Sequence, residues 1–271
     1  MEINNPYWNN PEHPNYNRWL NGRLNAKYRA EFVSAIIQNN TGLGNKTVLD
    51  IGSGLGGTVY NLDHSGNTVI SLDIALDKLK KQDKADNISL MCADGRKLPI
   101  VDSSIDIVIL QDVIEHVPDV KYLISEVHRV LKNDGIVYIS SPNKLSVINI
   151  FADPHWGLPL VSLMNRNMIK SIVLKHFRKS EYNRDEFAAL LSLAEIFILF
   201  DAFSSVSLQS KFAVSELFKG NRGIIWTASH LRWLKFIKFM RFDRLYIKWF
   251  DDKPGFMNKY IIPNFYIITK K

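Results

Sequence analysis

The sequence predicts an α/β protein with a seven-stranded, mostly parallel sheet and helices on both of its faces. The first observation is that short β-rich runs alternate with amphipathic segments from residue 47 to residue 140. The second is a dense cluster of glycines directly after the first of these runs. The third is a change of pattern after Pro142, where segments that are both apolar and basic predict helical insertions after strand 5 and between strands 6 and 7.

The first half of the chain supplies most of the expected sheet. An irregular arm reaches Pro14, and a helix is expected from Tyr16 to Gln38 because its apolar residues recur at helical spacing. Five strands follow: Thr47–Ile51, Asn67–Asp73, Ile88–Ala93, Ile105–Leu110 and Ile136–Ser140. Helices are expected between them at Gly56–Asp63, Lys78–Lys84 and Asp119–Leu131.

The second half is expected to contain the insertions. Residues 144–179 predict a mostly helical insertion, and residues 183–186 have the character of a capping box that opens a helix to Leu193. The sixth and seventh strands are expected at Ile196–Phe203 and Asn264–Thr269, with a second insertion at 212–250 between them. The chain therefore divides into an arm and helix (1–45), a ligand-binding core (46–143) and the insertions with the final strands (144–271).

The composition is that of a soluble globular protein. The chain has 271 residues, of which 46% are hydrophobic and 23% charged, and these values exclude disordered, collagen-like and low-complexity chains. Cys92 is the only cysteine, so an internal disulfide and a cysteine-rich zinc site are excluded. The first residues lack the pattern of a secretory signal, and the longest apolar run is interrupted by Glu195. We expect a cytoplasmic protein without a transmembrane segment.

The glycine cluster, in the segment Val48–Gly57, is the strongest functional signal. Glycines at 52, 54 and 56 or 57 let the backbone turn tightly and admit a ligand at the N-terminus of the following helix. Their spacing also fits a dinucleotide-binding loop, with Asp73 as the ribose-binding acid. Asp50 favours a different ligand, because a carboxylate before the turn would repel a pyrophosphate but suit a sulfonium and an ammonium group.

Four motifs, in order and at matching spacing, resemble the class I S-adenosylmethionine-dependent methyltransferases, a group with a Rossmann-like domain, and within it the methyltransferase type 11-like proteins. They are Val48–Gly57, Thr68–Asp73, Cys92–Gly95 with Leu98–Pro99, and Asp106–Pro118. In that family these loops bind the methionine, ribose and adenine parts of the cofactor. The resemblance implies S-adenosyl-L-methionine as cofactor, held by Asp50, Gly52, Ser53, Gly54, Gly56, Asp73, Ile74, Asp94, Gly95 and Gln111.

Glu115 and His116 would then lie next to the cofactor. Methyl transfer to a hydroxyl requires loss of the acceptor's proton, and His has a suitable pKa, so His116 is the candidate catalytic base. A carbon, nitrogen or thiolate acceptor needs no base, and His116 would then cap or brace its helix.

The acceptor site is expected beyond strand 5. Asn143, His155 and Trp156 are candidates for substrate binding, although Trp156 could equally pack inward at the entry to a helix. Gln111-Asp112-Val113-Ile114 stands where nucleic-acid amino-methyltransferases have an Asn-Pro-Pro-Tyr type of motif, so a nucleic-acid substrate is disfavoured. No metal is implied, because no carboxylate-histidine ligand set is evident.

Positive charge is concentrated in the second half. Residues 1–150 have a balance of −2, whereas residues 151–271 have +9. The segment 230–250 interleaves basic and aromatic residues and predicts either peripheral membrane contact or a cap over the active site. Its basic residues wind around a helix rather than forming one polar face.

The sequence thus predicts a methyltransferase acting on a small-molecule, glycan or lipid-linked acceptor, through oxygen. Two alternatives remain open at this point. One is a nucleotide-cofactor oxidoreductase of the NAD type, and the other is a noncatalytic binding protein that retains the fold.

Overall fold

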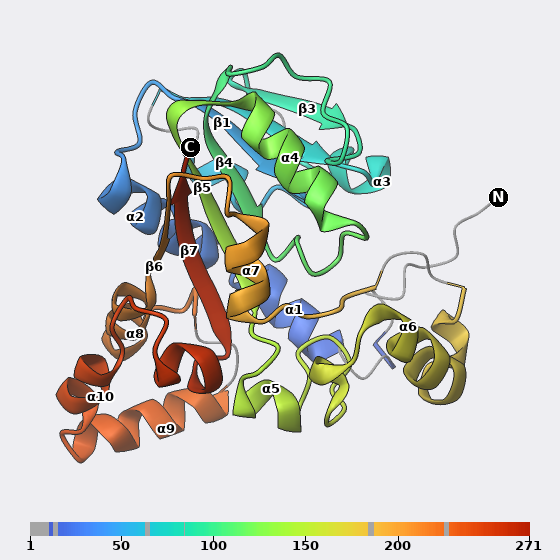
Figure 1. The fold of residues 1–271 in the computed structure, drawn as a ribbon. Coiled ribbons are helices and arrows are strands. Elements are labelled where there is room, and N and C mark those ends of the chain that lie inside the picture. The colour runs from blue at the N-terminus through green and yellow to red at the C-terminus, as the bar shows by residue number, and fades with distance from the viewer. Residues whose placement is uncertain (1–10, 13–15, 63–65, 84, 184–186, 225–227) are drawn as a thin grey trace.

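A computed structural model confirms the predicted seven-stranded sheet (Figure 1). The structure describes residues 11–12, 16–62, 66–83, 85–183, 187–224 and 228–271. The strands are β1 (Thr47–Ile51), β2 (Thr68–Asp73), β3 (Ile88–Cys92), β4 (Ile105–Gln111), β5 (Leu131–Pro142), β6 (Ser205–Leu208) and β7 (Asn264–Lys270). Their order is β3-β2-β1-β4-β5-β7-β6. The first five strands are parallel, whereas β7 runs antiparallel between β5 and β6.

Helices cover both faces of this sheet, as predicted. On one face, α4 (Val120–Val130) buries Leu123, Val127 and Val130, which recur at helical spacing, and α7 (Leu193–Leu199) packs into the same apolar cluster. On the other face, α2 (Ala26–Asn40) buries Val33 and Ile36 against the sheet. Both faces of the central strands are therefore buried, which explains why these strands are continuous apolar runs.

Several helices of the first half differ from the expectation in length. The helix expected from Tyr16 to Gln38 is divided into α1 (Tyr16–Leu24) and α2, with Asn25 between them. The segment expected as a helix from residue 56 is mostly a turn, with one 3-10 turn at Val59–Asn61, and its residue 63 lies outside the described residues. The α3 helix is short, at Leu76–Leu79.

The predicted sixth strand at Ile196–Phe203 is wrong, because this segment contains α7. The Ser192 side chain accepts from the Glu195 N–H and the Glu195 carboxylate accepts from the Ser192 N–H, which is a reciprocal cap that starts a helix. The helix expected to end at Leu193 is also wrong where the structure describes it, since residues 187–190 have no regular structure. Most of the capping box expected there, residues 184–186, lies outside the described residues.

Helical insertions occur after β5 and between β6 and β7, as predicted. The first contains α5 (Val147–Phe151), α6 (Arg166–Met168), a π-helix at Ile169–Phe177, and 3-10 turns at Val161–Leu163 and Lys179–Glu181. It has a small apolar core of its own, formed around Trp156, Leu174 and Phe187. The second contains α8 (Ser210–Lys219), α9 (Ala228–Phe239), α10 (Asp243–Trp249) and a π-helix at Met257–Ile261. No helix among the described residues is long and apolar enough to span a membrane.

Candidate active site

The glycine loop after β1 adopts the backbone that its sequence predicts. Gly52, Gly54 and Gly56 have φ angles of 73°, 57° and 80°, in the left-handed region that side chains disfavour. A Cβ atom on Gly52 would lie 2.6 Å from a methyl group of Val113. The atom nearest to a Cβ on Gly54 would be the Gly52 carbonyl oxygen, 4.0 Å away, so the space above Gly54 is open. The loop therefore presents bare backbone at the carboxyl edge of the sheet.

Asp73, at the end of β2, fastens this loop to the next one. One carboxylate oxygen accepts a 2.8 Å hydrogen bond from the Gly54 N–H, and the other accepts one of 2.8 Å from the Ala75 N–H. Each oxygen has a second lone pair, so the carboxylate can still accept bonds from a pair of hydroxyl groups. Ile74, beside it, is 54% exposed and lies at the same edge.

Gln82 is a site residue that the sequence analysis missed. Its buried side chain donates a 2.8 Å hydrogen bond to the Gly54 carbonyl oxygen and accepts one of 2.8 Å from the Ser71 hydroxyl. It also donates to the Ser53 hydroxyl at 3.2 Å. Gln82 thus links the glycine loop to Ser71 of β2. It follows α3 and belongs to no motif, so only the fold shows its proximity to the loop.

Asp50 lies in β1 and is almost completely buried. Burial, and next the negative charge of Asp73, raise the pKa of the Asp50 carboxyl from 3.8 to about 8. A cation placed near Asp50 would stabilise its ionised form. Asp50 can therefore supply a negative charge next to the glycine loop when a cation binds there.

The remaining predicted cofactor residues surround the same edge. The Asp94 carboxylate pairs with Arg96 at 2.7 Å, and the hydrogen bond from Arg96 holds the pKa of Asp94 below its ordinary value. A Cβ atom on Gly95 would lie 2.9 Å from Leu123, so this loop packs tightly on α4. The side-chain amide oxygen of Gln111, at the end of β4, accepts a 2.5 Å hydrogen bond from the Thr58 hydroxyl. The roles of these residues in binding stay predictions.

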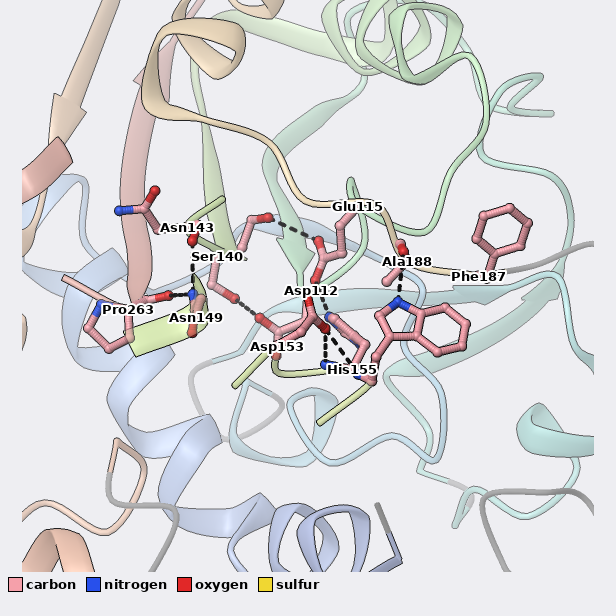
Figure 2. Close-up of polar contacts among 12 residues, drawn as sticks. Asp112, Glu115, Ser140, Asn143, Asn149, Asp153, His155, Phe187, Ala188 and Pro263 are labelled. Atoms are coloured by element: carbon pink, nitrogen blue, oxygen red, sulfur yellow. Dashed lines mark hydrogen bonds and ion pairs between the residues drawn. The ribbon is translucent and has the colours of Figure 1, made fainter. Parts of the chain in front are cut away.

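Glu115, His116 and His155 meet just beyond β4. Glu115 is fully buried, and one of its carboxylate oxygens accepts a 3.1 Å hydrogen bond from the Ser141 hydroxyl. The other lies 3.7 Å from Nε2 of His155 (Figure 2). The rings of His116 and His155 meet edge to face, with centroids 4.9 Å apart. Two imidazoles and a buried carboxylate are therefore concentrated next to the predicted cofactor loop.

The backbone around this cluster is firmly positioned. Asp112 has a φ of 54°, and its carboxylate pairs with Arg29 at 2.5 Å and accepts from the Ser140 hydroxyl at 2.9 Å (Figure 2). The Glu115 carbonyl oxygen accepts from Arg166 and from the Ala189 N–H. The first insertion thus closes over the end of β4 through these bonds.

The core of the chain is similar to a known family of domains. A family model described as a methyltransferase domain matches residues 49–139. Residues 49–139 thus have the sequence of a methyltransferase domain. The matched stretch includes the glycine loop, the β2 acid and Glu115–His116, and the seven-stranded sheet places them at one edge.

Relatives of the methyltransferase domain match only part of this chain. An uncharacterized protein of Methanocaldococcus jannaschii is 34% identical over 54% of this chain and 63% of its own length. A malonyl-[acyl-carrier protein] O-methyltransferase of Hamiltonella defensa is 31% identical over 43% of this chain and 45% of its own. The chain thus spans less than two thirds of the length of these two relatives.

A solved structure extends the likeness of the fold beyond the methyltransferase domain. Phosphoethanolamine N-methyltransferase 2 of Haemonchus contortus, in complex with S-adenosyl-L-methionine, has a TM-score of 0.53 and 16% identity. The match covers 95% of this chain and 58% of that chain. The likeness of the fold therefore spans most of this chain.

Two residues predicted to bind substrate are instead used for packing around the methyltransferase domain. The Asn143 amide is fully buried and donates to the carbonyl oxygens of Ile262 and Lys259, at 2.9 and 3.0 Å. The Trp156 indole is 4% exposed, and its N–H lies 3.4 Å from the Ala188 carbonyl oxygen (Figure 2). Of the three candidates, His155 is the one that the structure brings beside His116.

Proposed function

We propose that the whole protein is an S-adenosylmethionine-dependent methyltransferase that methylates a hydroxyl oxygen of a small-molecule, glycan or lipid-linked acceptor. The observation that supports this most is the juxtaposition at one sheet edge. The glycine loop tied to Asp73 offers a cofactor cradle, and Glu115, His116 and His155 lie just beyond it. An acceptor lying against His116 would be adjacent to that cradle.

The electrostatics of the cradle suit a cationic cofactor. When bound, the cofactor supplies a methyl group on a positively charged sulfur. Asp50 is held partly protonated near neutral pH by its raised pKa, and a nearby cation would draw it into the charged form. Binding of the cation should therefore release a proton. A nicotinamide dinucleotide would instead bring the negative charge of its pyrophosphate close to Asp50.

The imidazoles support a hydroxyl as the acceptor. In the transfer the bond from sulfur to the methyl carbon breaks, and a bond from the acceptor oxygen to that carbon forms. The hydroxyl proton must leave, and we assign assistance in its loss to His116. One relative is named an O-methyltransferase, and one structural neighbour is named an N-methyltransferase. An amine acceptor would make much less use of the buried Glu115 and its two imidazoles.

A lipid-linked acceptor is supported by the surface of α9 and α10. These helices pack on the core through Leu234, Ile237, Tyr246 and Ile247. The same helices also expose aromatic and basic side chains together, which we call the basic-aromatic surface: Arg232, Lys235, Phe236, Lys238, Phe239, Arg241, Phe242, Arg244, Lys248 and Trp249. Trp233 belongs to the same segment, but its side chain lies outside the described part of the chain.

Exposed apolar side chains lie at the same end of the molecule as the basic-aromatic surface. In Figure 1, α5 lies at the same lower end of the molecule as α9 and α10, and its Ile148 and Phe151 are 53% and 74% exposed. Exposed aromatic rings beside basic side chains fit the interface of an anionic membrane. The location that follows is cytoplasmic, with peripheral contact to a membrane that holds the acceptor.

Isothermal calorimetry with three ligands tests the proposed function. S-adenosylmethionine and S-adenosylhomocysteine should bind the wild-type protein, whereas NAD should not. Asp73→Ala should lose about one to two decades of affinity, because hydrogen bonds to a charged acceptor contribute about 1.5 to 3 kcal/mol. Binding of NAD alone would support the oxidoreductase instead. Cofactor binding with no methylation of any hydroxyl compound tested would support the noncatalytic alternative.

A further inference from the structure

The cluster beyond β4 has the composition and spacing of a metal site. Glu115 and His116 follow β4, and His155 comes from the first insertion, so the fold unites residues that the sequence keeps apart. One ligand atom from each side chain lies within 4.8 Å of the others. We infer that Glu115, His116 and His155 bind a divalent transition-metal ion.

The distances are compatible with coordination. Bonds from zinc to imidazole nitrogen and carboxylate oxygen are about 2.0 to 2.2 Å long, which places ligand atoms about 3.4 Å apart in a tetrahedron. The three ligand atoms here lie within 4.8 Å of one another, so the most distant pair would have to approach by at most about 1.4 Å. Two imidazoles and one carboxylate are a ligand set that suits zinc, iron and their first-row neighbours. Three protein ligands leave at least one position open.

Neighbouring side chains orient the proposed ligands, as outer partners do at metal sites. The Ser141 hydroxyl donates to the Glu115 carboxylate and orients it. The buried Asp153 carboxylate accepts from the N–H groups of His155 and Trp156, at 2.7 and 3.0 Å, and fixes the turn that presents His155 (Figure 2). Such outer partners hold ligands in the geometry that a metal requires.

Burial of Glu115 also favours a cation. A fully buried carboxylate is costly unless positive charge lies close to it. Arg166 is a cationic neighbour of Glu115. Its two terminal nitrogens donate to the carbonyl oxygens of Glu115 and Phe187. A metal ion would place positive charge directly on the carboxylate.

The role of the ion rests on the proposed function and sharpens it. An acceptor hydroxyl in the open position would have its pKa lowered by the ion, and its proton would leave to solvent. The resulting oxygen then forms the bond to the methyl carbon as that carbon leaves sulfur. In this case His116 assists the loss of the proton as a ligand and not as a base.

Direct binding measurements test the metal site without reference to turnover. Chelator-treated protein is titrated with Co²⁺, followed by visible absorption, and with Zn²⁺ in competition with a chromophoric chelator. We expect one ion per chain in the wild type. Glu115→Gln and His155→Gln should each weaken binding by at least the roughly 10- to 100-fold that loss of an outer partner costs. His176→Gln removes an exposed histidine and should bind as the wild type does.

The two proposals fail separately. Calorimetry with S-adenosylhomocysteine on the same variants should show wild-type affinity, which demonstrates an intact fold and cofactor site. Equal metal affinity in the wild type and in both cluster variants, or no Co²⁺ absorption in the wild type, would overturn the metal site and leave the methyltransferase standing. Metal binding without any binding of S-adenosylhomocysteine would overturn the proposed function and leave the metal site.

Discussion

The buried carboxyl of Asp50 couples the pH of the solution to the stability of the protein. Its pKa is raised to about 8 in the folded state, compared with 3.8 for an exposed group. Between these values the folded protein keeps a proton that the unfolded chain has lost. The stabilisation from Asp50 is therefore complete below about pH 4 and declines as the pH rises towards about 8.

Asp50→Asn should flatten this dependence. Over the interval from about pH 5 to about pH 8, Asp50 lowers the free energy of unfolding by up to about 1.4 kcal/mol per pH unit, and the variant should lack that slope. Urea unfolding of both proteins at several pH values measures it. Parallel stability curves for the wild type and the variant would show that Asp50 is ionised in the fold.

His116 is expected to affect turnover more than cofactor affinity. His116→Ala should lower the rate of hydroxyl methylation by about 10²- to 10⁴-fold, because the acceptor proton loses the group that assists its departure. Affinity for S-adenosylhomocysteine should change little. His176→Ala serves as the control, since His176 is exposed on the π-helix of the first insertion. Unchanged turnover in His116→Ala would remove this residue from the mechanism.

In the glycine loop, substitution of Gly52 should mainly lower stability, whereas substitution of Gly54 should mainly weaken cofactor binding. A Cβ at Gly52 meets Val113 at 2.6 Å, so Gly52→Ala should lower stability by about 1 to 3 kcal/mol through overpacking, in addition to backbone strain. A Cβ at Gly54 meets open space, so Gly54→Ala should cost only the strain of about 1 to 2 kcal/mol. Its main effect should be weaker cofactor binding, because the Cβ occupies the cradle.

Thermal unfolding and calorimetry on the same pair measure both effects. The reverse pattern, with Gly54→Ala binding normally and Gly52→Ala fully stable, would place the ligand elsewhere. Gly54→Val should bind still less cofactor than Gly54→Ala, because its branched side chain fills more of the cradle.

Elements differ in how far the sequence determines them. The strands β1 to β5 were predictable because each contains a short apolar run bounded by polar or turn residues, and the helix α4 because its apolar residues recur at helical spacing. The segment Ile196–Phe203 was not, because an apolar run of that length fits a buried strand and a buried helix equally well. The cap formed by Ser192 and Glu195 decides the case in favour of a helix.

Site residues also differ in how far the sequence alone identifies them. The glycines, Asp73 and His116 lie in contiguous motifs beside strand ends, so the sequence alone is sufficient to locate them. Gln82 acts through contacts with segments distant in the chain, and no local pattern marks it. His155 is a candidate from its place after strand 5, but only the fold shows that it lies beside Glu115 and His116. Asn143 is a candidate from its place at the carboxyl end of strand 5, and only the fold shows that its amide is buried and bonded to the carbonyl oxygens of Lys259 and Ile262.

The second half of the chain has an excess of positive charge, and the basic-aromatic surface exposes part of it to a possible membrane. Sedimentation with vesicles should require anionic lipid and weaken as salt rises. Changing Arg232, Lys235 and Lys238 together to Gln should reduce binding, because each basic residue near such a surface contributes about 1 kcal/mol.

A matched triple variant controls for net charge. Lys78, Lys80 and Lys81 lie in and just after α3, far from α9 in Figure 1, and their change to Gln removes the same charge. This variant should still bind the vesicles. Equal loss in both triple variants, or binding that is independent of lipid charge, would contradict a membrane role for the basic-aromatic surface.

The antiparallel strand β7 also constrains how the molecule is assembled during synthesis. It lies between β5 and β6, so β6 leaves the ribosome before the strand that must separate it from β5 exists. Until residues 264–270 emerge, β5 presents an open edge and β6 has no neighbour in the sheet. The pairing joins distant segments and should be slow. A nascent chain stalled between residues 210 and 260 should therefore be a target for chaperones that bind unpaired strands.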